Sequence, residues 1–269
     1  MDRERLRKIR NFQSDDWYPA LVVRPITIAV MLVIADWKFL TPNRLTTVAN
    51  ICKLAGAALV IPEWAHALGF TPWTGTVLAV VLLQGGILFD HLDGTMARYR
   101  RSFTVFGSFY DKTSDIITWF AITSAIGWRG YVVTGEPLMM ALTQASAAFV
   151  AVRGYMKWLI TSETNKLKWH EAKADVQAAL AKNTAPPKIS EPPVRSAGDW
   201  LRWFGKMSWQ FYRFEEMDLF FWVGLGLLLG EEELLCWLLA VSQVGGFISM
   251  TIIRHLEAHK VDVAMRPRS

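Results

Sequence analysis

The chain has 269 residues, of which 52% are hydrophobic and 20% are charged, and its mean hydropathy is +0.21. An ordinary soluble domain carries about 25% charged residues, so this composition excludes a disordered chain, and two cysteines are too few for a disulfide scaffold. The formal net charge of +5 suits a nucleic-acid binder, a protein on an anionic membrane surface, or the inside loops of a membrane protein. The positions of the charges decide among these classes.

Six apolar runs are candidates for membrane-spanning helices, because a span needs about 20 mostly apolar residues. They cover residues 44–62, 74–98, 105–127, 137–158, 215–230 and 234–254. Between the fourth and fifth runs, residues 161–212 are polar and predict a cytosolic loop with one helix near 171–182. The predicted fold class is therefore an all-α integral membrane protein with six transmembrane helices.

The charges outside these runs orient the protein. If the N-terminus is inside, the three outward connections hold a single basic residue, Arg129, whereas the other Lys and Arg residues outside the spans fall on the inward loops and the tails. This asymmetry follows the positive-inside rule and predicts that both termini are cytoplasmic. The basic excess is then explained by topology, so no nucleic-acid partner is expected. The predicted location is the cytoplasmic membrane of a prokaryote.

Residues 17–40 predict an N-terminal amphipathic helix that lies in the membrane interface. Their apolar part, residues 26–35, would rise only about 15 Å as a helix, which is half of a bilayer core. Trp17, Tyr18 and Trp37 are expected to anchor it. The predicted organisation has four parts: a tail with the interfacial helix (1–43), spans one to four (44–160), the cytoplasmic loop (161–212), and the last two spans with a cytoplasmic tail (213–269).

Four aspartates lie within the apolar runs, namely Asp90, Asp93, Asp111 and Asp115. A charged aspartate near the centre of a membrane helix costs about 2.5–3.5 kcal/mol on insertion scales. Asp90 and Asp93 share one helix face, and Asp111 and Asp115 share a face of the next helix. Because the connection between the two helices is short, we expect the helices to be antiparallel neighbours with the carboxylates together at their cytoplasmic ends.

Four carboxylates so close together require cations. Hard oxygen ligands without a nearby cysteine favour Mg²⁺, Mn²⁺ or Ca²⁺, and two divalent ions would neutralise four carboxylates. This layout is typical of a two-metal site that handles phosphoryl oxygens. Gly94, Ala97 and Gly107 lie on the carboxylate faces and would let a helix or a flat ligand approach closely. Arg98 could bind a phosphate with both arms of its guanidinium.

The pattern resembles the signature of the CDP-alcohol phosphotransferases, also called CDP-alcohol phosphatidyltransferases. It reads Asp90-x-x-Asp93-Gly94-x-x-Ala97-Arg98, then eight residues, then Gly107-x-x-x-Asp111-x-x-x-Asp115. The segment 41–46, Thr-Pro-Asn-Arg-Leu-Thr, looks like another feature of the family. The resemblance implies a metal-dependent enzyme that takes a CDP-linked donor such as CDP-diacylglycerol, releases CMP, and joins the phosphoryl group to an alcohol. It also implies a homodimer.

The resemblance further implies roles for single residues. Asp90, Asp93 and Asp111 would be ligands of Mg²⁺ or Mn²⁺, and Asp115 would be either a ligand or the general base on the acceptor hydroxyl. The nucleotide would lie against a set made up of Asp93, Gly94, Ala97, Arg98 and Gly107. The catalytic pair would be Asp111 and Asp115.

Three weaker signals remain open. Arg153 and Lys157, one helical turn apart in the fourth span, either extend to the interface or form an anion site for a phosphorylated acceptor such as inositol phosphate or glycerol phosphate. Asn43 is expected to cap the first span, with a contact to the active site as the alternative. The acidic residues 215–218 suit the N-terminus of the fifth span.

Two other functions use similar residues. An intramembrane prenyltransferase also places Asp-rich motifs and Mg²⁺ around a pyrophosphate, but its motifs lie far apart in sequence. A divalent cation transporter would spread acidic residues through several spans, whereas here they sit on two adjacent helices near one face. The sequence does not name the acceptor alcohol.

Overall fold

The computed structural model describes residues 9, 16–181, 196–209, 214–215 and 217–265. Its elements are η1 (Pro19–Val23), α2 (Arg24–Ile34), α3 (Pro42–Val60), α4 (Pro62–Ala67), α5 (Pro72–Arg100), α6 (Val105–Thr134), α7 (Leu138–Ala181), α8 (Ala197–Trp209), α9 (Leu219–Leu229) and α10 (Glu232–Met265). The described residues contain no strand, which confirms the all-α class. Each of the six predicted spans overlaps one of these helices.

Three of the six helices, α5, α6 and α10, are long and apolar enough to cross a membrane. By contrast, α9 has 11 residues, so it is about 16 Å long, roughly half of a hydrocarbon core. The count of six spans therefore stays a prediction.

The α5 and α6 helices run antiparallel, but they are not packed against each other as the sequence suggested. Instead α3 packs closely against both of them, and the described side-chain contacts between α5 and α6 include the aspartates at one end and Arg129 with Thr76 at the other. The connection between them turns sharply because Arg101, at the end of α5, adopts the left-handed conformation with φ of 54°. Side chains from α3 thus have access to the space between the two aspartate helices.

Threonine side chains start three of these helices. Thr41 begins α3 by accepting a hydrogen bond from the Arg44 amide at 3.3 Å, so the expectation that Asn43 caps this helix is wrong. Thr71 and Thr104 begin α5 and α6 in the same way. Pro42 follows Thr41 directly, where its fixed φ suits the first helical turn.

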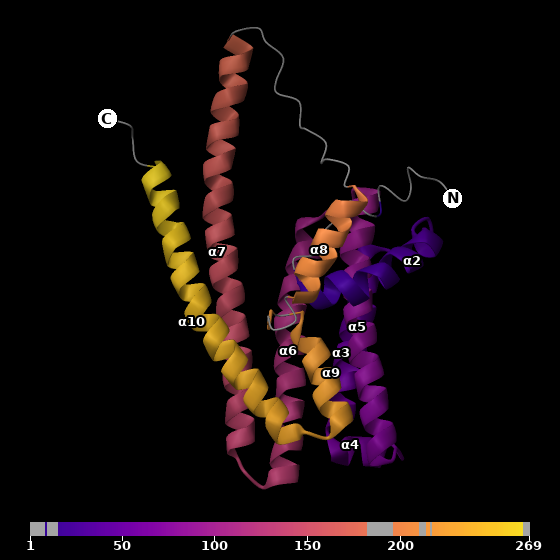
Figure 1. Cartoon of the computed structure of the whole chain (residues 1–269). Helices are drawn as coiled ribbons and strands as arrows, with labels where there is room; N and C mark the ends of the chain where they lie inside the picture. Colours follow the sequence, from indigo (N-terminus) through magenta and orange to yellow (C-terminus); the bar gives the residue numbers. More distant parts are fainter. Residues whose placement is uncertain (1–8, 10–15, 182–195, 210–213, 216, 266–269) are drawn as a thin grey trace.

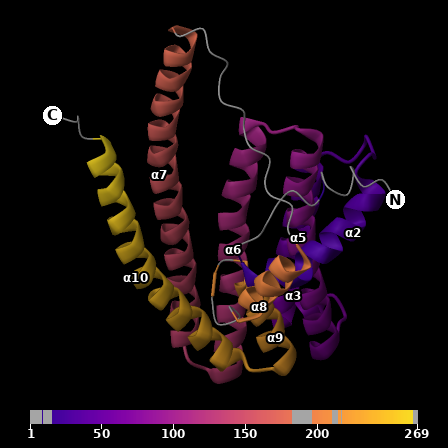
Figure 2. The same cartoon turned by 45° about the horizontal axis from the view of Figure 1, so that its top comes forward.

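The second half of the chain forms a separate pair of helices. As Figures 1 and 2 show, α7 and α10 run side by side, and α7 also packs on α6. The α7 helix continues without a break beyond residue 160 to Ala181, so the first part of the polar stretch extends the fourth predicted span as a helix. Residues 182–195, with all four prolines of that stretch, lie outside the described residues.

The N-terminal segment lies across the helices (Figure 1). Arg100, at the end of α5, donates hydrogen bonds to the carbonyl oxygens of Ala35 and Trp37, at 2.8 and 2.9 Å, and so fixes the end of α2. Trp17 and Tyr18 are buried in the protein core, so the expectation that they anchor the segment in the interface is wrong. Trp37 is 46% exposed, and the interfacial position of α2 stays a prediction.

Candidate active site

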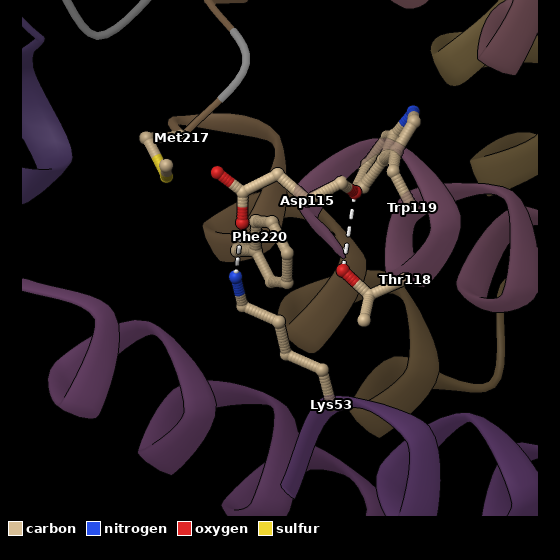
Figure 3. Close-up of a pocket in the computed structure, with 6 residues that line it drawn as sticks. All are labelled: Lys53, Asp115, Thr118, Trp119, Met217 and Phe220. Atoms are coloured by element: carbon tan, nitrogen blue, oxygen red, sulfur yellow. Dashed lines mark hydrogen bonds and ion pairs between the residues drawn. The ribbon is translucent and has the colours of Figure 1, made fainter. Parts of the chain in front are cut away.

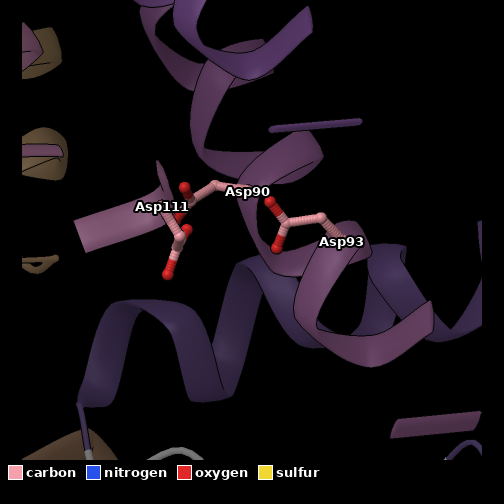
Figure 4. A group of neighbouring side chains, drawn as sticks. All are labelled: Asp90, Asp93 and Asp111. Carbon is pink, nitrogen blue, oxygen red and sulfur yellow. The ribbon is translucent and has the colours of Figure 1, made fainter. Parts of the chain in front are cut away.

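Three of the four aspartates converge where α5 ends and α6 begins. One carboxylate oxygen from each of Asp90, Asp93 and Asp111 lies within 4.8 Å of the others, and Figure 4 shows the three side chains pointing toward one another. Asp93 is buried, whereas Asp90 and Asp111 are half-buried. The spacing of these residues in the sequence therefore predicted their convergence correctly.

The fourth aspartate, Asp115, lies one turn further along α6 and is engaged differently. Its carboxylate accepts a hydrogen bond from the ammonium of Lys53 at 2.8 Å, and the same ammonium lies 3.2 Å from a carboxylate oxygen of Asp90. Lys53 comes from α3 and rises between the aspartate helices (Figure 3). A small cavity beside this pair is lined by Lys53, Asp115, Thr118, Trp119, Met217 and Phe220.

Lys53 belongs to this cluster, although the sequence did not indicate it as a candidate. It sits in the middle of the first apolar run, where a lysine costs as much as an aspartate. That position was the available signal, because a cation buried in a membrane helix calls for a buried anion. Its partners lie 37 and 62 residues away, so the pairing itself required the arrangement of α3 between α5 and α6.

A second side chain from α3 orients Asp93. The Thr46 hydroxyl donates a hydrogen bond to the Asp93 carboxylate, and both residues are buried. Since Thr46 ends the segment 41–46, this bond connects that segment to the aspartate cluster. This hydrogen bond restricts the orientation of the Asp93 carboxylate.

The small residues of the motif allow close approach. A Cβ added to Gly107 would lie 3.0 Å from the Asn43 side-chain oxygen and 2.9 Å from the Thr104 hydroxyl. The absence of a side chain therefore lets the start of α6 approach the start of α3. Ala97 is almost fully buried, and at Gly94 an added Cβ would lie 3.4 Å from the Arg98 guanidinium.

Arg98 is close to a second arginine. Burial and, after it, the nearby charge of Arg98 lower the pKa of Arg24 on α2 to about 10. Arg24 still carries its charge at neutral pH, and Arg98 in turn interacts with the charge of Asp93.

The structure places Arg153 in a contact between α7, α10 and the residues before α9. Its guanidinium pairs with Glu215 at 2.9 Å and donates to the Gln243 side-chain oxygen. Gly246 makes room for it, since an added Cβ there would lie 2.7 Å from the guanidinium. Lys157, one turn further along α7, is exposed. A phosphate bound at this pair would therefore share Arg153 with Glu215.

The donor set fits a hard divalent cation. The three carboxylates supply only oxygen, and opposite oxygens on a Mg²⁺ ion lie about 4.2 Å apart, twice the bond length of about 2.1 Å. A spread of at most 4.8 Å reaches this value with small side-chain movements. The residues that would hold the ion are Asp90, Asp93 and Asp111.

Comparison with known proteins agrees with this chemistry. Residues 39–183, more than half of the chain, match the family model for CDP-alcohol phosphatidyltransferase. The chain therefore belongs to the CDP-alcohol phosphatidyltransferase family, as its motif predicted. With helices able to cross the bilayer, it is a membrane protein of that family.

One relative is the phosphatidylinositol phosphate synthase of Corynebacterium glutamicum, which is 36% identical over 106 residues. The match covers 39% of this chain and 43% of the relative, so it spans less than half of either protein. Two solved structures of the phosphatidylinositol phosphate synthase of Mycobacterium tuberculosis, one with CDP-DAG bound and one in complex with manganese and citrate, are 19% identical, with TM-scores of 0.44 and 0.43. Each comparison covers 92% of this chain, and 98% and 94% of the solved chains. Similarity at this level of identity and TM-score does not indicate what binds at the aspartate cluster of this chain.

Proposed function

We propose that the protein transfers a phosphatidyl group from CDP-diacylglycerol to an acceptor alcohol and releases CMP, as a step of phospholipid synthesis. The observation that carries this proposal is the convergence of Asp90, Asp93 and Asp111 at the end of two membrane helices, in a chain whose family takes CDP-linked donors. Family membership also argues against the prenyltransferase and the cation transporter.

In this proposal the three carboxylates hold Mg²⁺ or Mn²⁺, which supplies Lewis acidity to the diphosphate oxygens of the donor. The sequence also predicts a second ion, shared with Asp115. Asp93, Gly94, Ala97, Arg98 and Gly107 contact the nucleotide. The cytidine preference comes from the family alone.

Asp115 is proposed as the general base or as a further ligand. As a base, it takes the proton of the acceptor hydroxyl while the acceptor oxygen forms its bond to phosphorus. The bond from that phosphorus to the bridging oxygen of CMP breaks, and CMP leaves. The hydrogen bond from Lys53 holds the Asp115 carboxylate in one orientation for this step.

We further propose a phosphorylated acceptor, with inositol phosphate favoured because the Corynebacterium glutamicum relative is a phosphatidylinositol phosphate synthase. Arg153 and Lys157 would bind its phosphate. For the whole protein we propose six spans, an interfacial N-terminal helix, cytoplasmic termini, a homodimer, and residence in the cytoplasmic membrane of a prokaryote.

The test uses the full chain purified in detergent, CDP-diacylglycerol, and inositol phosphate, glycerol phosphate, serine and choline in separate reactions. We expect CMP release together with one new lipid, identified by mass spectrometry. Asp111→Asn should abolish both, whereas Asp262→Asn, which changes an exposed aspartate on α10, should leave both intact. Absence of CMP release with every acceptor would contradict the proposal.

A further inference from the structure

The charges of the cluster do not balance within the described contacts. One ammonium, that of Lys53, pairs with two of the four carboxylates, and its side chain is 2% exposed. The ammonium touches Asp90 and Asp115 but not the other two carboxylates at ion-pair distance among the described residues. Asp90 is thus shared between the three-carboxylate group and the lysine.

The packing around Lys53 is built for a side chain in this position. A Cβ at Gly86 of α5 would lie 2.7 Å from Lys53 Cγ and 3.1 Å from the Ala49 carbonyl oxygen. The aliphatic stem therefore fills a space that only a glycine leaves open. On the other side, the Phe220 ring centroid lies 6.0 Å from the ammonium. The stem packs against α5 at Gly86, and the ammonium is directed at the carboxylates and does not reach outward to the interface.

The structure assigns to Lys53 the place of a built-in cation between Asp90 and Asp115. A divalent ion held by these two carboxylates would compete with the ammonium for them. We therefore infer that the site loads in order, with a first ion on Asp90, Asp93 and Asp111 and a weaker second ion that competes with Lys53. This inference rests on the metal site of the proposed function.

Like charges explain why the second ion would be weaker. An ammonium and a divalent cation repel each other strongly at short range away from bulk water, and Asp115 must exchange its bond to Lys53 for a bond to the ion. A neutral side chain at position 53 removes both penalties. Damage to the fold would only weaken binding, so tighter binding of the second ion cannot arise from a merely structural role of Lys53.

The experiment measures Mn²⁺ binding to chelator-treated, full-length protein in detergent by titration calorimetry and by the paramagnetic resonance signal of free Mn²⁺. Wild type should bind one ion tightly and a second at least about 10-fold more weakly, a difference of about 1.4 kcal/mol. Lys53→Gln should tighten the second ion at least about 10-fold and change the first much less. Lys53→Met serves as a second neutral variant, chosen for its apolar stem.

Lys112→Gln is the matched control, because Lys112 neighbours Asp111 in sequence but is exposed, and it should leave the two-stage binding in place. Two equally tight ions in wild type, or unchanged binding in both neutral variants, would overturn the inference while leaving the metal site intact. Complete absence of Mn²⁺ binding in wild type would instead refute the metal site of the proposed function.

Discussion

Two buried charged clusters lie near opposite ends of α6, and they differ in charge balance. Near its C-terminal end, Arg129 meets Glu232 of α10 at 2.7 Å and donates to the Thr76 hydroxyl of α5 at 2.7 Å. That cluster contains one cation, one anion and a hydroxyl that completes the hydrogen bonds. The aspartate cluster at the other end has four anions and one ammonium.

We interpret this difference in charge balance as the difference between a structural cluster, around Arg129, and a functional one, formed by the aspartates. The Arg129 cluster is satisfied by its own members and connects three helices, so it needs no further partner. The aspartate cluster has more carboxylates than the one ammonium that pairs with it, an arrangement that favours binding of further cations. We therefore expect substitutions in the first cluster to change stability and substitutions in the second to change metal binding and turnover.

The largest effect is expected at Asp93. Asp93→Asn should lower CMP release by about 1,000-fold or more, which corresponds to about 4 kcal/mol of lost transition-state stabilisation, because a metal ligand is lost. The melting temperature in the presence of chelator should stay the same or rise, since one repelling charge is gone. CMP release and thermal melting of the same preparation measure both. If Asp93→Asn were strongly destabilised but had normal turnover, the aspartate cluster would be the structural one, contrary to our expectation.

The opposite result is expected at Glu232. Glu232→Gln leaves Arg129 as a buried cation without its anion, and removal of one partner of a buried pair costs about 3–5 kcal/mol. The unfolding free energy in detergent should therefore drop by about 3 kcal/mol, while turnover per folded molecule stays normal. Glu231→Gln, which changes an exposed neighbour, is the control and should have little effect on either. Loss of turnover in folded Glu232→Gln would show that this cluster also serves catalysis.

Arg153 combines features of both clusters, because it is ion-paired with Glu215 like Arg129 with Glu232, yet it is proposed to bind the acceptor. Arg153→Ala should raise the acceptor KM by about 10- to 100-fold, the loss of one charge-assisted contact at about 1.5–3 kcal/mol, with little change in the CDP-donor KM. Glu215→Gln frees the guanidinium and should lower the acceptor KM. If the donor KM rises in Arg153→Ala instead, Arg153 holds the phosphates of the donor, and if neither KM changes, the residue only connects α7 and α10.

The smallest effect is expected at Thr46. Thr46→Val removes the hydroxyl that orients Asp93, and the loss of one hydrogen bond to a charged group, at about 1.5 kcal/mol, should lower turnover about 10-fold. Thr46→Ser keeps the hydroxyl and should restore most of the turnover. Thr134→Val, at the far end of α6, controls for a general effect of the substitution. Full activity in Thr46→Val would mean that Asp93 needs no support from α3.

The aspartate cluster could be predicted because its order is local. The i, i+3 and i, i+4 spacings place the residues on helix faces, and a short turn brings the two helix ends together. Lys53 and the pair Arg153–Glu215 could not be predicted in this way. Each joins helices that are far apart in the sequence, and nothing in the spacing shows that α3 lies between α5 and α6.

The extent of α7 was underestimated for another reason. Hydropathy falls after residue 160, but a polar composition does not end a helix, and no proline occurs from residue 138 until residue 186. Likewise, Asn43 suits a helix cap, yet Thr41 has the preferred position immediately before Pro42. The short helices α4 and α8 were not predicted either, and the loop helix expected near residues 171–182 is the end of α7, whereas the all-α class and the motif were predicted from the sequence.

The most direct test of the central claim, that the unbalanced carboxylates hold a divalent ion for transfer from a CDP-linked lipid, is CMP release by chelator-treated protein as Mn²⁺ is added back. CDP-diacylglycerol and a mixture of the candidate acceptors are supplied throughout. We expect no release before the addition and restored release after it, with no restoration in Asp93→Asn. Full release by wild type in excess chelator would contradict the account.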